Sequence, residues 1–132
     1  MIGLDTNVLV RLVVADDPRQ ADTARRFVSR YCTPESPGFI DCVVLAEFVW
    51  VLGASYGYAR SEIAAAVEGL LAGGDRIVEH HDAVRASLED YKAGRAGFVD
   101  GLIARVNRAY GCKATATFDH KAAKLDGFVQ VT

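Results

Sequence analysis

The chain of 132 residues is predicted to fold as an α/β protein with a mainly parallel sheet, because segments typical of strands and of helices alternate along it. The composition supports a globular fold, since 51% of the residues are hydrophobic and 24% are charged. A chain of this length can bury one hydrophobic core. We therefore expect a single domain over residues 1–132.

The first half of the chain is expected to contain two strands, each followed by helices. The strands are expected at residues 1–5 and 39–40, and the helices at 6–14, 18–31, 42–55 and 61–72. Asp17, Asp41 and Ser61 are expected to cap helices, because short polar side chains accept hydrogen bonds from the free N–H groups of a first turn. Pro18 suits the first helical position, and two prolines predict a loop at 33–38.

The second half of the chain is expected to add three strands and three helices. The strands are expected at residues 76–79, 113–117 and 128–131, and the helices at 82–94, 98–110 and 120–125. Asp82 is expected to cap the first of these helices, and Gly111 is expected to end the second.

The helix expected at residues 42–55 is apolar around its whole circumference. Its apolar residues are Val43, Val44, Leu45, Phe48, Val49, Trp50, Val51 and Leu52. Such a helix must be covered on every side, and the sheet covers one side. We expect the other side to meet a second copy of the chain or a partner protein, with the helix at 61–72 as the alternative cover.

Composition and local patterns limit the other classes of protein. Three cysteines without a CxxC motif are expected to be free thiols, and their spacing from the three histidines does not indicate a zinc site. The longest apolar run is interrupted by Glu47 and is too short to span a membrane, and no signal peptide is visible, so a cytoplasmic protein is expected. A net charge of −2 neither indicates nor excludes binding to nucleic acid.

Four acidic residues follow or interrupt apolar segments that lie far apart in the chain. They are Asp5, Glu47, Asp100 and Asp119. Burying an unpaired carboxylate is costly, so a bound divalent cation would explain why acids stand beside core segments. The carboxyl ends of parallel strands and the first turns of the connecting helices lie at one edge of a sheet, so we expect the four acids to converge there.

Each acid also has an ordinary structural explanation. Asp5 can stabilise a turn, Asp100 can favour the first turn of a helix, and Asp119 can cap one. Glu47 is different, because no basic residue lies one helical turn away from it. Mg²⁺ prefers carboxylate oxygens, and such a site can hold a phosphodiester, activate water and stabilise charge on the leaving oxygen. The sequence therefore predicts metal-assisted hydrolysis of phosphodiesters.

Four segments of the chain resemble, in order and spacing, the motifs of PIN domains. They are LDTNVLVRL, VVLAEFVWVL, GFVDGLIA and ATFDHKAAKL. More narrowly, they resemble the VapC ribonuclease toxins of bacterial VapBC toxin–antitoxin pairs. The resemblance implies a three-layer α/β/α fold and an endoribonuclease that uses one or two Mg²⁺ or Mn²⁺ ions and cuts structured RNA such as tRNA or rRNA. It also implies a homodimer and a cognate VapB-type antitoxin whose C-terminal segment lies across the acidic edge.

Carried over residue by residue, the resemblance makes these four acids the catalytic cluster. Asp5 and Asp100 are the implied metal ligands, while Glu47 and Asp119 would bind a second metal or hold metal-bound water. Gly97 occupies a position where some family members have a further acid, which weakens the expectation of a second metal.

Three polar residues match family positions that orient the cluster: Thr6, Asn7 and Thr117. Asn7 as a cap of the first helix and Thr117 as an ordinary strand residue are the alternatives. Among the arginines of the first two helices, Arg11 is the best candidate for an RNA contact, because it is expected near the Asp5 edge. Tyr56 and Tyr58 are expected to pack at a helix end, with stacking on an unpaired base as the alternative.

Two rival functions belong to other classes. The chain can be an inactive PIN-like module that acts through a protein partner, but the complete set of four acids argues against this reading. It can also be a phosphotransferase with Asp5 as nucleophile, but such enzymes usually carry a second aspartate where this chain has Asn7. Metal-dependent cleavage of RNA is the leading hypothesis.

Overall fold

The computed structural model describes residues 1–132 and contains six α-helices, one 3₁₀ helix and five short strands. The chain divides into two compact units, the N-terminal unit (residues 1–81) and the C-terminal unit (residues 82–132). Every strand pair in both units is parallel, which confirms the predicted α/β fold with parallel strands. None of the helices has the length and hydrophobicity needed to cross a membrane.

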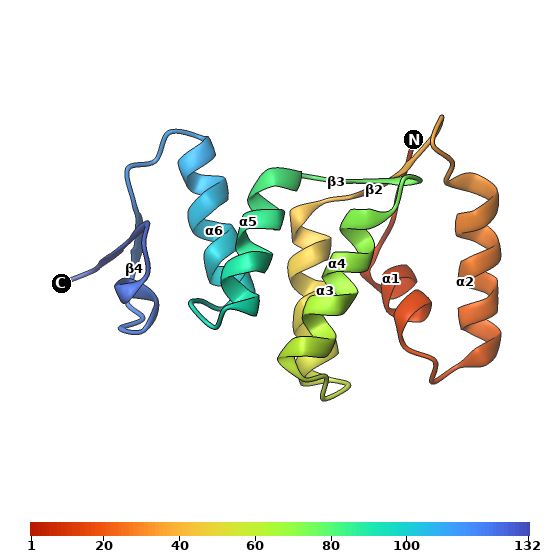
Figure 1. Ribbon diagram of the computed structural model, residues 1–132, viewed down its shortest axis with the longest axis horizontal. Helices are drawn as coiled ribbons and strands as arrows, with labels where there is room; N and C mark the ends of the chain where they lie inside the picture. The colour runs from red at the N-terminus through yellow and green to blue at the C-terminus, as the bar shows by residue number, and fades with distance from the viewer. The chain divides into compact units, whose positions relative to one another are not determined.

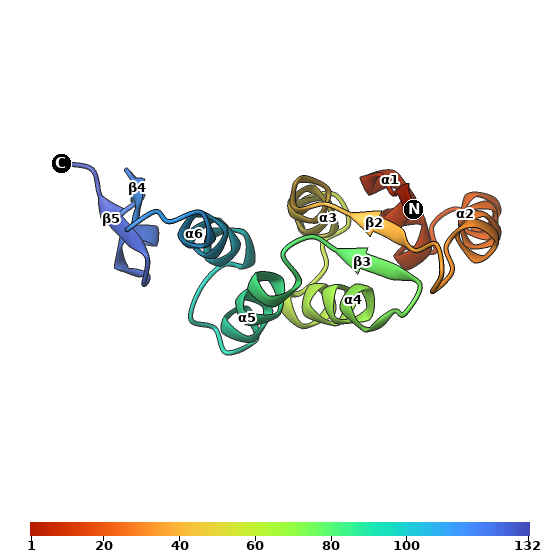
Figure 2. The same cartoon turned by 90° about the horizontal axis from the view of Figure 1, so that it is seen from above.

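The N-terminal unit contains a three-stranded parallel sheet in the order β1-β2-β3. Its elements are β1 (Ile2–Gly3), α1 (Thr6–Val13), α2 (Pro18–Tyr31), β2 (Gly38–Ile40), α3 (Cys42–Ala54), α4 (Arg60–Ala72) and β3 (Arg76–Val78). In the sheet, Ile2 lies opposite Gly38 and Phe39 lies opposite Ile77. Figure 1 shows α3 and α4 side by side, and Figure 2 shows α1 beside α3.

The core of this unit explains why these segments pack as they do. Its fully buried side chains include Leu9, Ile40, Leu45, Phe48, Leu52 and Val67, which come from α1, β2, α3 and α4. At Gly38 the backbone passes so close to its neighbours that a Cβ atom would lie 2.9 Å from Sγ of Cys32 and 3.0 Å from Cδ1 of Leu4. Only glycine fits there without a shift of the core.

Helix α3 is covered on most of its surface but not on all of it. Val43 is 81% exposed and Trp50 is 66% exposed, although Leu45, Phe48 and Leu52 on the same helix are fully buried. Val43, Glu47, Trp50 and Ala54 recur at helical spacing, so they form one stripe that we call the exposed α3 stripe. The alternative that α4 covers the rest of this helix is therefore wrong.

The C-terminal unit begins in α5 (His81–Lys92) and continues through α6 (Phe98–Ala109), β4 (Thr115–Thr117), the 3₁₀ helix η1 (Ala122–Lys124) and β5 (Phe128–Gln130). β4 and β5 form a two-stranded parallel sheet. Its core joins α5 to α6, where the rings of Tyr91 and Phe98 meet edge to face with centroids 6.2 Å apart.

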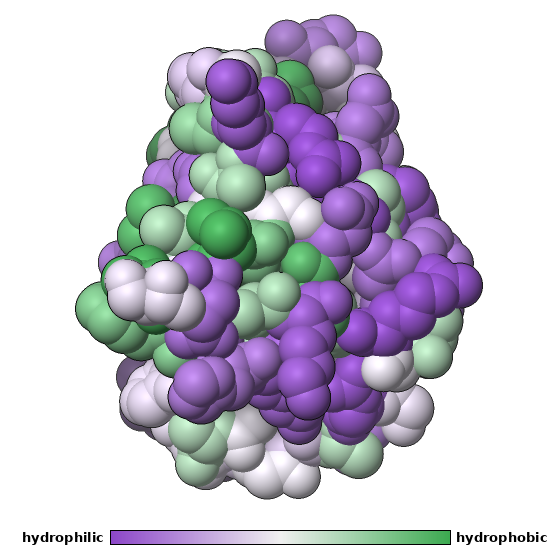
Figure 3. All heavy atoms as spheres, turned by 90° about the vertical axis from the view of Figure 1, so that its left-hand side faces the viewer, coloured by the Kyte–Doolittle hydropathy of each residue, from purple (hydrophilic) through white to green (hydrophobic).

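The C-terminal unit leaves several large apolar side chains in solvent. They are Ile103, Tyr110, Phe118, Val129 and Val131. Figure 3 shows apolar side chains gathered among hydrophilic ones on the side of the molecule that it displays. Phe118, Val129 and Val131 lie in or beside the two-stranded sheet, which has few neighbours to bury them.

Some predicted element boundaries are wrong for local reasons. α4 begins at Arg60 rather than after a Ser61 cap, because the Glu62 carboxylate accepts the N–H of Ala59 at 2.9 Å and fixes an earlier start. α5 begins at His81, so Asp82 lies inside the first turn instead of capping it. The helix expected at residues 120–125 is only a three-residue 3₁₀ helix.

Other predicted boundaries are confirmed. The Asp17 side chain accepts from Gln20 N at 3.1 Å and caps α2, with Pro18 as its first residue. Asp41 caps α3 by accepting from Val44 N at 2.8 Å. Gly111 ends α6 with a φ of +91°, in the left-handed region that glycine adopts without strain. All three cysteines are free, as expected.

Candidate functional site

The N-terminal unit brings two of the four predicted acids to one cavity. Asp5 and Glu47 both line an open cavity of about 330 Å³ between α1 and α3. The other lining residues are Thr6, Asn7, Val10, Arg11, Val51 and Tyr56. Thr6, Asn7 and Arg11, which the sequence analysis assigned to this region, thus line the cavity, and their roles stay predictions.

Asp5 is placed by the junction between β1 and α1. It follows the first strand and caps α1, with Oδ1 accepting the N–H of Thr6 at 2.7 Å. The predicted alternative that Asn7 caps this helix is wrong, because Asp5 does so. Oδ2 of Asp5 makes no hydrogen bond within the protein, so it is available to a ligand in the cavity.

Glu47 and Asp100 have no partner in the protein. Glu47 lies on the exposed α3 stripe and Asp100 lies half-buried in the first turn of α6, and neither makes a hydrogen bond or an ion pair. Asp5, Glu47 and Asp119 are exposed to solvent, so the premise that these acids are buried at a cost is wrong. The case for a metal rests instead on the cavity that Asp5 and Glu47 share and on carboxylate oxygens that make no hydrogen bond.

Thr6 carries an unusual polar atom. Its residue is only 5% exposed, and its Oγ1 has no hydrogen-bond partner. Buried polar atoms are nearly always hydrogen-bonded, and leaving one unsatisfied costs about 1–3 kcal/mol. This hydroxyl is enclosed by the protein and is not exposed to the cavity, so it is a local cost of the fold rather than a contact for a ligand.

Arg11 lines the same cavity but is already partly engaged. Its Nη1 donates to Oδ1 of Asp16 at 2.8 Å, in an ion pair at the end of α1. The remaining N–H groups of the guanidinium stay available, because a guanidinium carries five of them. Its role as an RNA contact stays a prediction.

Asp119 and Thr117 form one local structure in the C-terminal unit. Oδ1 of Asp119 accepts the N–H groups of Lys121 at 2.8 Å and Ala122 at 3.1 Å, and it holds the start of η1. Oγ1 of Thr117 in turn accepts the N–H of Asp119 at 3.0 Å. Hydrogen bonds from the backbone of Ala122 and Lys121 lower the pKa of the Asp119 carboxyl, so it is ionised over a wide pH range.

Sequence reasoning missed two features of the N-terminal unit. Glu79 follows β3, and its Oε1 accepts the N–H of Cys42 at 2.9 Å, beside the Asp41 cap. Burial, followed by the nearby Glu79 carboxylate, raises the pKa of Cys42 to about 11, so this thiol is not a nucleophile. Tyr56, which was expected to pack at a helix end, follows the last residues of α3 and also lines the cavity with Asp5 and Glu47.

The four acids belong to different units. Asp5 and Glu47 are in the N-terminal unit, and Asp100 and Asp119 are in the C-terminal unit. No group of three or more His, Cys, Asp or Glu side chains in this structure stands close enough to hold a metal ion. The convergence of all four acids on one metal site therefore stays a prediction.

Comparison with known proteins assigns a family. A family model described as the PIN domain matches residues 2–128, which include all four acids. No curated protein matches the chain.

Proposed function

This chain belongs to the PIN-domain family, and from that premise we propose that it is a metal-dependent endoribonuclease, the toxin of a type II toxin–antitoxin pair. PIN domains are generally nucleases that act on RNA and generally use divalent metal ions. The observation that carries the proposal is the cavity that Asp5 and Glu47 line together.

In this proposal, Asp5, Glu47, Asp100 and Asp119 serve one catalytic site. Asp5 and Asp100 hold Mg²⁺ or Mn²⁺, and Glu47 and Asp119 bind a second ion or orient water. Carboxylate oxygens alone make up this donor set, and they suit hard cations of this kind. The bound ion would supply positive charge to a phosphodiester and acidify water.

The chain's own residues support this chemistry in ways that the contacts suggest. Thr6 would orient Asp5, because its backbone N–H donates to Oδ1 of Asp5 at 2.7 Å. Thr117 would position Asp119 through the hydrogen bond to its backbone. Asn7 and the free N–H groups of Arg11 would orient the RNA backbone beside Asp5.

Two protein partners complete the proposal. A second groove, lined among others by Val8 and Phe27 of α1 and α2, shares Asn7 and Arg11 with the acidic cavity, so an antitoxin segment in this groove would reach the acids. A homodimer through α3 would cover the apolar side chains of Val43 and Trp50, which stand in solvent. The antitoxin and the homodimer are both part of the proposal.

The alternative function is an inactive PIN-like module that works only through a partner. Structural acids are usually paired or satisfied by the protein, as Asp90 is by two arginines. Glu47 and Asp100 have no such partner, which favours a role in chemistry over a role in folding.

The proposal is tested by expressing the chain without an antitoxin and comparing it with Asp5→Asn and with Glu35→Gln. Glu35 is an exposed acid in the loop before β2, so its substitution is a matched control for the loss of one charge. We expect growth arrest from the parent and from Glu35→Gln, and normal growth with Asp5→Asn. Purified parent should also cut tRNA or rRNA in Mg²⁺ or Mn²⁺ and stop in EDTA. Harmless expression of all three, with no cleavage in vitro, would favour the binding module.

A further inference from the structure

The two units carry opposite charge. Residues 1–81 contain seven Lys and Arg against eleven Asp and Glu, which gives −4, whereas residues 82–132 contain eight against six, which gives +2. The net charge of the chain therefore hides a basic unit. Basic surfaces attract the phosphate backbone of nucleic acids.

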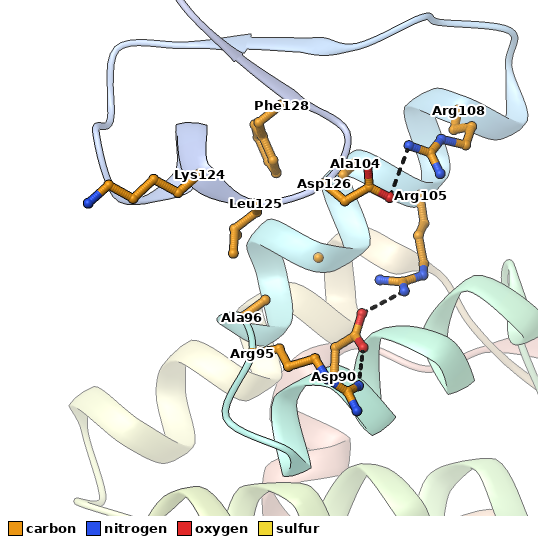
Figure 4. Close-up of a pocket in the computed structure, with 11 residues that line it drawn as sticks. Asp90, Arg95, Ala96, Ala104, Arg105, Arg108, Lys124, Leu125, Asp126 and Phe128 are labelled. Atoms are coloured by element: carbon orange, nitrogen blue, oxygen red, sulfur yellow. Dashed lines mark hydrogen bonds and ion pairs between the residues drawn. The ribbon is translucent and has the colours of Figure 1, made fainter.

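Part of this positive charge lines a cavity of about 460 Å³ between α5, α6 and the segment from η1 to β5. Figure 4 shows Asp90 of α5 beneath it, with dashed lines to Arg95 and Arg105. Nη1 of Arg95 lies 2.8 Å from Oδ1 of Asp90, and Nη2 of Arg105 lies 2.6 Å from Oδ2. One carboxylate therefore orients two guanidinium groups and leaves one positive charge uncompensated.

Arg108, one turn after Arg105 on α6, is held much more loosely. Its Nη2 lies 3.6 Å from Oδ2 of Asp126, whose side chain is 95% exposed. Exposed ion pairs of this kind contribute little free energy, so a phosphate can replace Asp126 at low cost. Lys124 at the rim makes no ion pair, and it adds a further positive charge.

The rest of the cavity wall is apolar. The ring of Phe128 from β5 and the side chain of Leu125 line it, together with the small residues Ala96, Gly101 and Ala104. Figure 4 shows Phe128 and Leu125 on the side of the cavity away from the Asp90 cluster. An aromatic ring and guanidinium groups on facing sides match the two parts of a nucleotide, its base and its phosphate.

We propose that this cavity binds one unstacked nucleotide of single-stranded RNA, with its phosphate at Arg105 and Arg108 and its base against Phe128. The inference rests on the proposed function, because it takes RNA as the substrate. It adds a second place, apart from the four acids, where the RNA strand is held. Arginine suits a phosphate because its planar fork donates two parallel hydrogen bonds. The volume lies within the range of small-ligand sites, which is about 300–1,000 Å³.

An acidic protein segment is the competing occupant. It would use the same arginines but would gain nothing specific from an aromatic ring face. The ring therefore separates the two readings, and Phe128→Leu is the decisive substitution, because leucine keeps an apolar side chain and removes the stacking surface. Arg108→Ala tests the phosphate contact, and Lys113→Ala, an exposed cation of the same unit that is absent from the cavity wall, is the matched control.

The experiment measures binding of the full chain to a labelled single-stranded oligouridine in EDTA, over a series of salt concentrations. We expect Phe128→Leu and Arg108→Ala each to weaken binding about 5- to 10-fold, and Lys113→Ala to change it less than about twofold. Arg108→Ala should also reduce the slope of log Kd against log salt by about 0.7, the value for one phosphate contact on a single strand. A fully paired duplex of the same length should bind without any effect of Phe128→Leu.

Three results would overturn the inference: no binding of RNA in EDTA, equal binding by parent and both variants, or an acidic peptide whose binding falls with Arg108→Ala while RNA binding does not. The last would assign the cavity to a protein segment. EDTA separates this test from that of the proposed function. Loss of binding in the two variants, with no cleavage by the parent in metal, would keep the cavity and refute the nuclease. Cleavage by the parent in metal, with RNA binding unchanged in both variants, would support the nuclease and refute the nucleotide site.

Discussion

The two units of this chain differ in what they offer a ligand. The N-terminal unit is acidic, and its cavity between α1 and α3 presents the carboxylates of Asp5 and Glu47. The C-terminal unit is basic, and its cavity presents arginines and an aromatic ring. A site that cuts RNA needs both properties, because carboxylates hold the catalytic cation while guanidinium groups hold the negative backbone. The net charge of −2 for the whole chain does not show that one unit is acidic and the other basic.

The units also differ in how well they are packed. The N-terminal unit surrounds a three-stranded sheet with four helices, and Phe48, Leu45 and Leu52 of α3 are fully buried. The C-terminal unit has a two-stranded sheet and exposes Phe118 and Tyr110. Sheets of two strands are marginal on their own, so the C-terminal unit should be the less stable of the two.

The largest expected effects are on the free energy of unfolding, and they test whether the two units unfold together. Phe48→Ala should cost about 3–5 kcal/mol and Leu88→Ala about 2–5 kcal/mol, because each leaves a cavity at a fully buried position in its own unit. Guanidinium denaturation is followed by fluorescence of Trp50, the only tryptophan, which lies in the N-terminal unit, and by circular dichroism of the whole chain. One shared transition that both variants shift would support the single domain that the sequence predicts. Two separate unfolding transitions, each shifted by only one of the variants, would contradict that single domain.

The second effect concerns the metal. Mg²⁺ or Mn²⁺ at 100 times its Kd should stabilise the folded chain by about 2.7 kcal/mol, because the ion binds the assembled carboxylates and not the unfolded chain. Differential scanning fluorimetry should show a higher Tm with metal for the parent and for Glu35→Gln, and no shift for Asp5→Asn. The same shift in all three proteins would place the metal elsewhere.

A pair of glycines tests how closely the basic cavity is packed. Gly111 and Gly127 both have positive φ, but only at Gly127 would a Cβ atom crowd other groups, 3.3 Å from Cβ of Ala104 and from Nη2 of Arg108. Gly111→Ala should cost about 1 kcal/mol from backbone strain alone, and Gly127→Ala should cost more. Chemical denaturation measures both. A smaller cost at Gly127 would mean that the cavity wall yields easily.

The smallest effect is a pH dependence in the C-terminal unit. The hydrogen bond from Arg105, with a smaller one from Arg95, lowers the pKa of Asp90. A lowered pKa stabilises the folded state above the unfolded value of about 3.9, and this stabilisation is lost as the pH falls through the folded value. Asp90→Asn should therefore lower stability by less than about 1 kcal/mol near neutral pH. The difference should shrink as the pH falls below about 4 and vanish once the pH lies below the lowered pKa of the folded state. Thermal melts of both proteins across this range provide the measurement, and a difference that grows in acid would refute the assignment.

Much of the fold could be predicted from the sequence because the signals were local. The caps at Asp17 and Asp41, the proline at the start of α2 and the glycine after α6 act within one helical turn. The predicted elements failed where another local contact took precedence, as when Glu62 set the start of α4 ahead of Ser61. A side of α3 left for a second copy or a partner was expected, but the residues of the exposed α3 stripe could not be predicted, because composition does not show which residues the neighbouring elements reach.

Part of the lining of the candidate cavity could be predicted from the sequence, but its environment could not. The spacing of apolar segments identified Asp5 and Glu47, and the structure places both at one cavity. The sequence alone could not show that these acids are exposed, that Tyr56 lines the same cavity, or that the Thr6 hydroxyl is buried without a partner. The basic cavity was missed because its arginines and Phe128 are ordinary residues in sequence. They line one cavity only because folding brings α5, α6 and β5 together.

The most direct test of the central claim is a double-mutant cycle on the rate of RNA cleavage, with Asp5→Asn from the N-terminal unit and Asp100→Asn from the C-terminal unit. Residues that act together in one catalytic site are strongly non-additive. We predict that each single substitution lowers the initial rate at least about 100-fold and that the double variant is no slower than the slower single variant. Asp100→Asn with the activity of the parent, or two losses that simply multiply, would contradict the proposal that Asp5 and Asp100 serve one catalytic site.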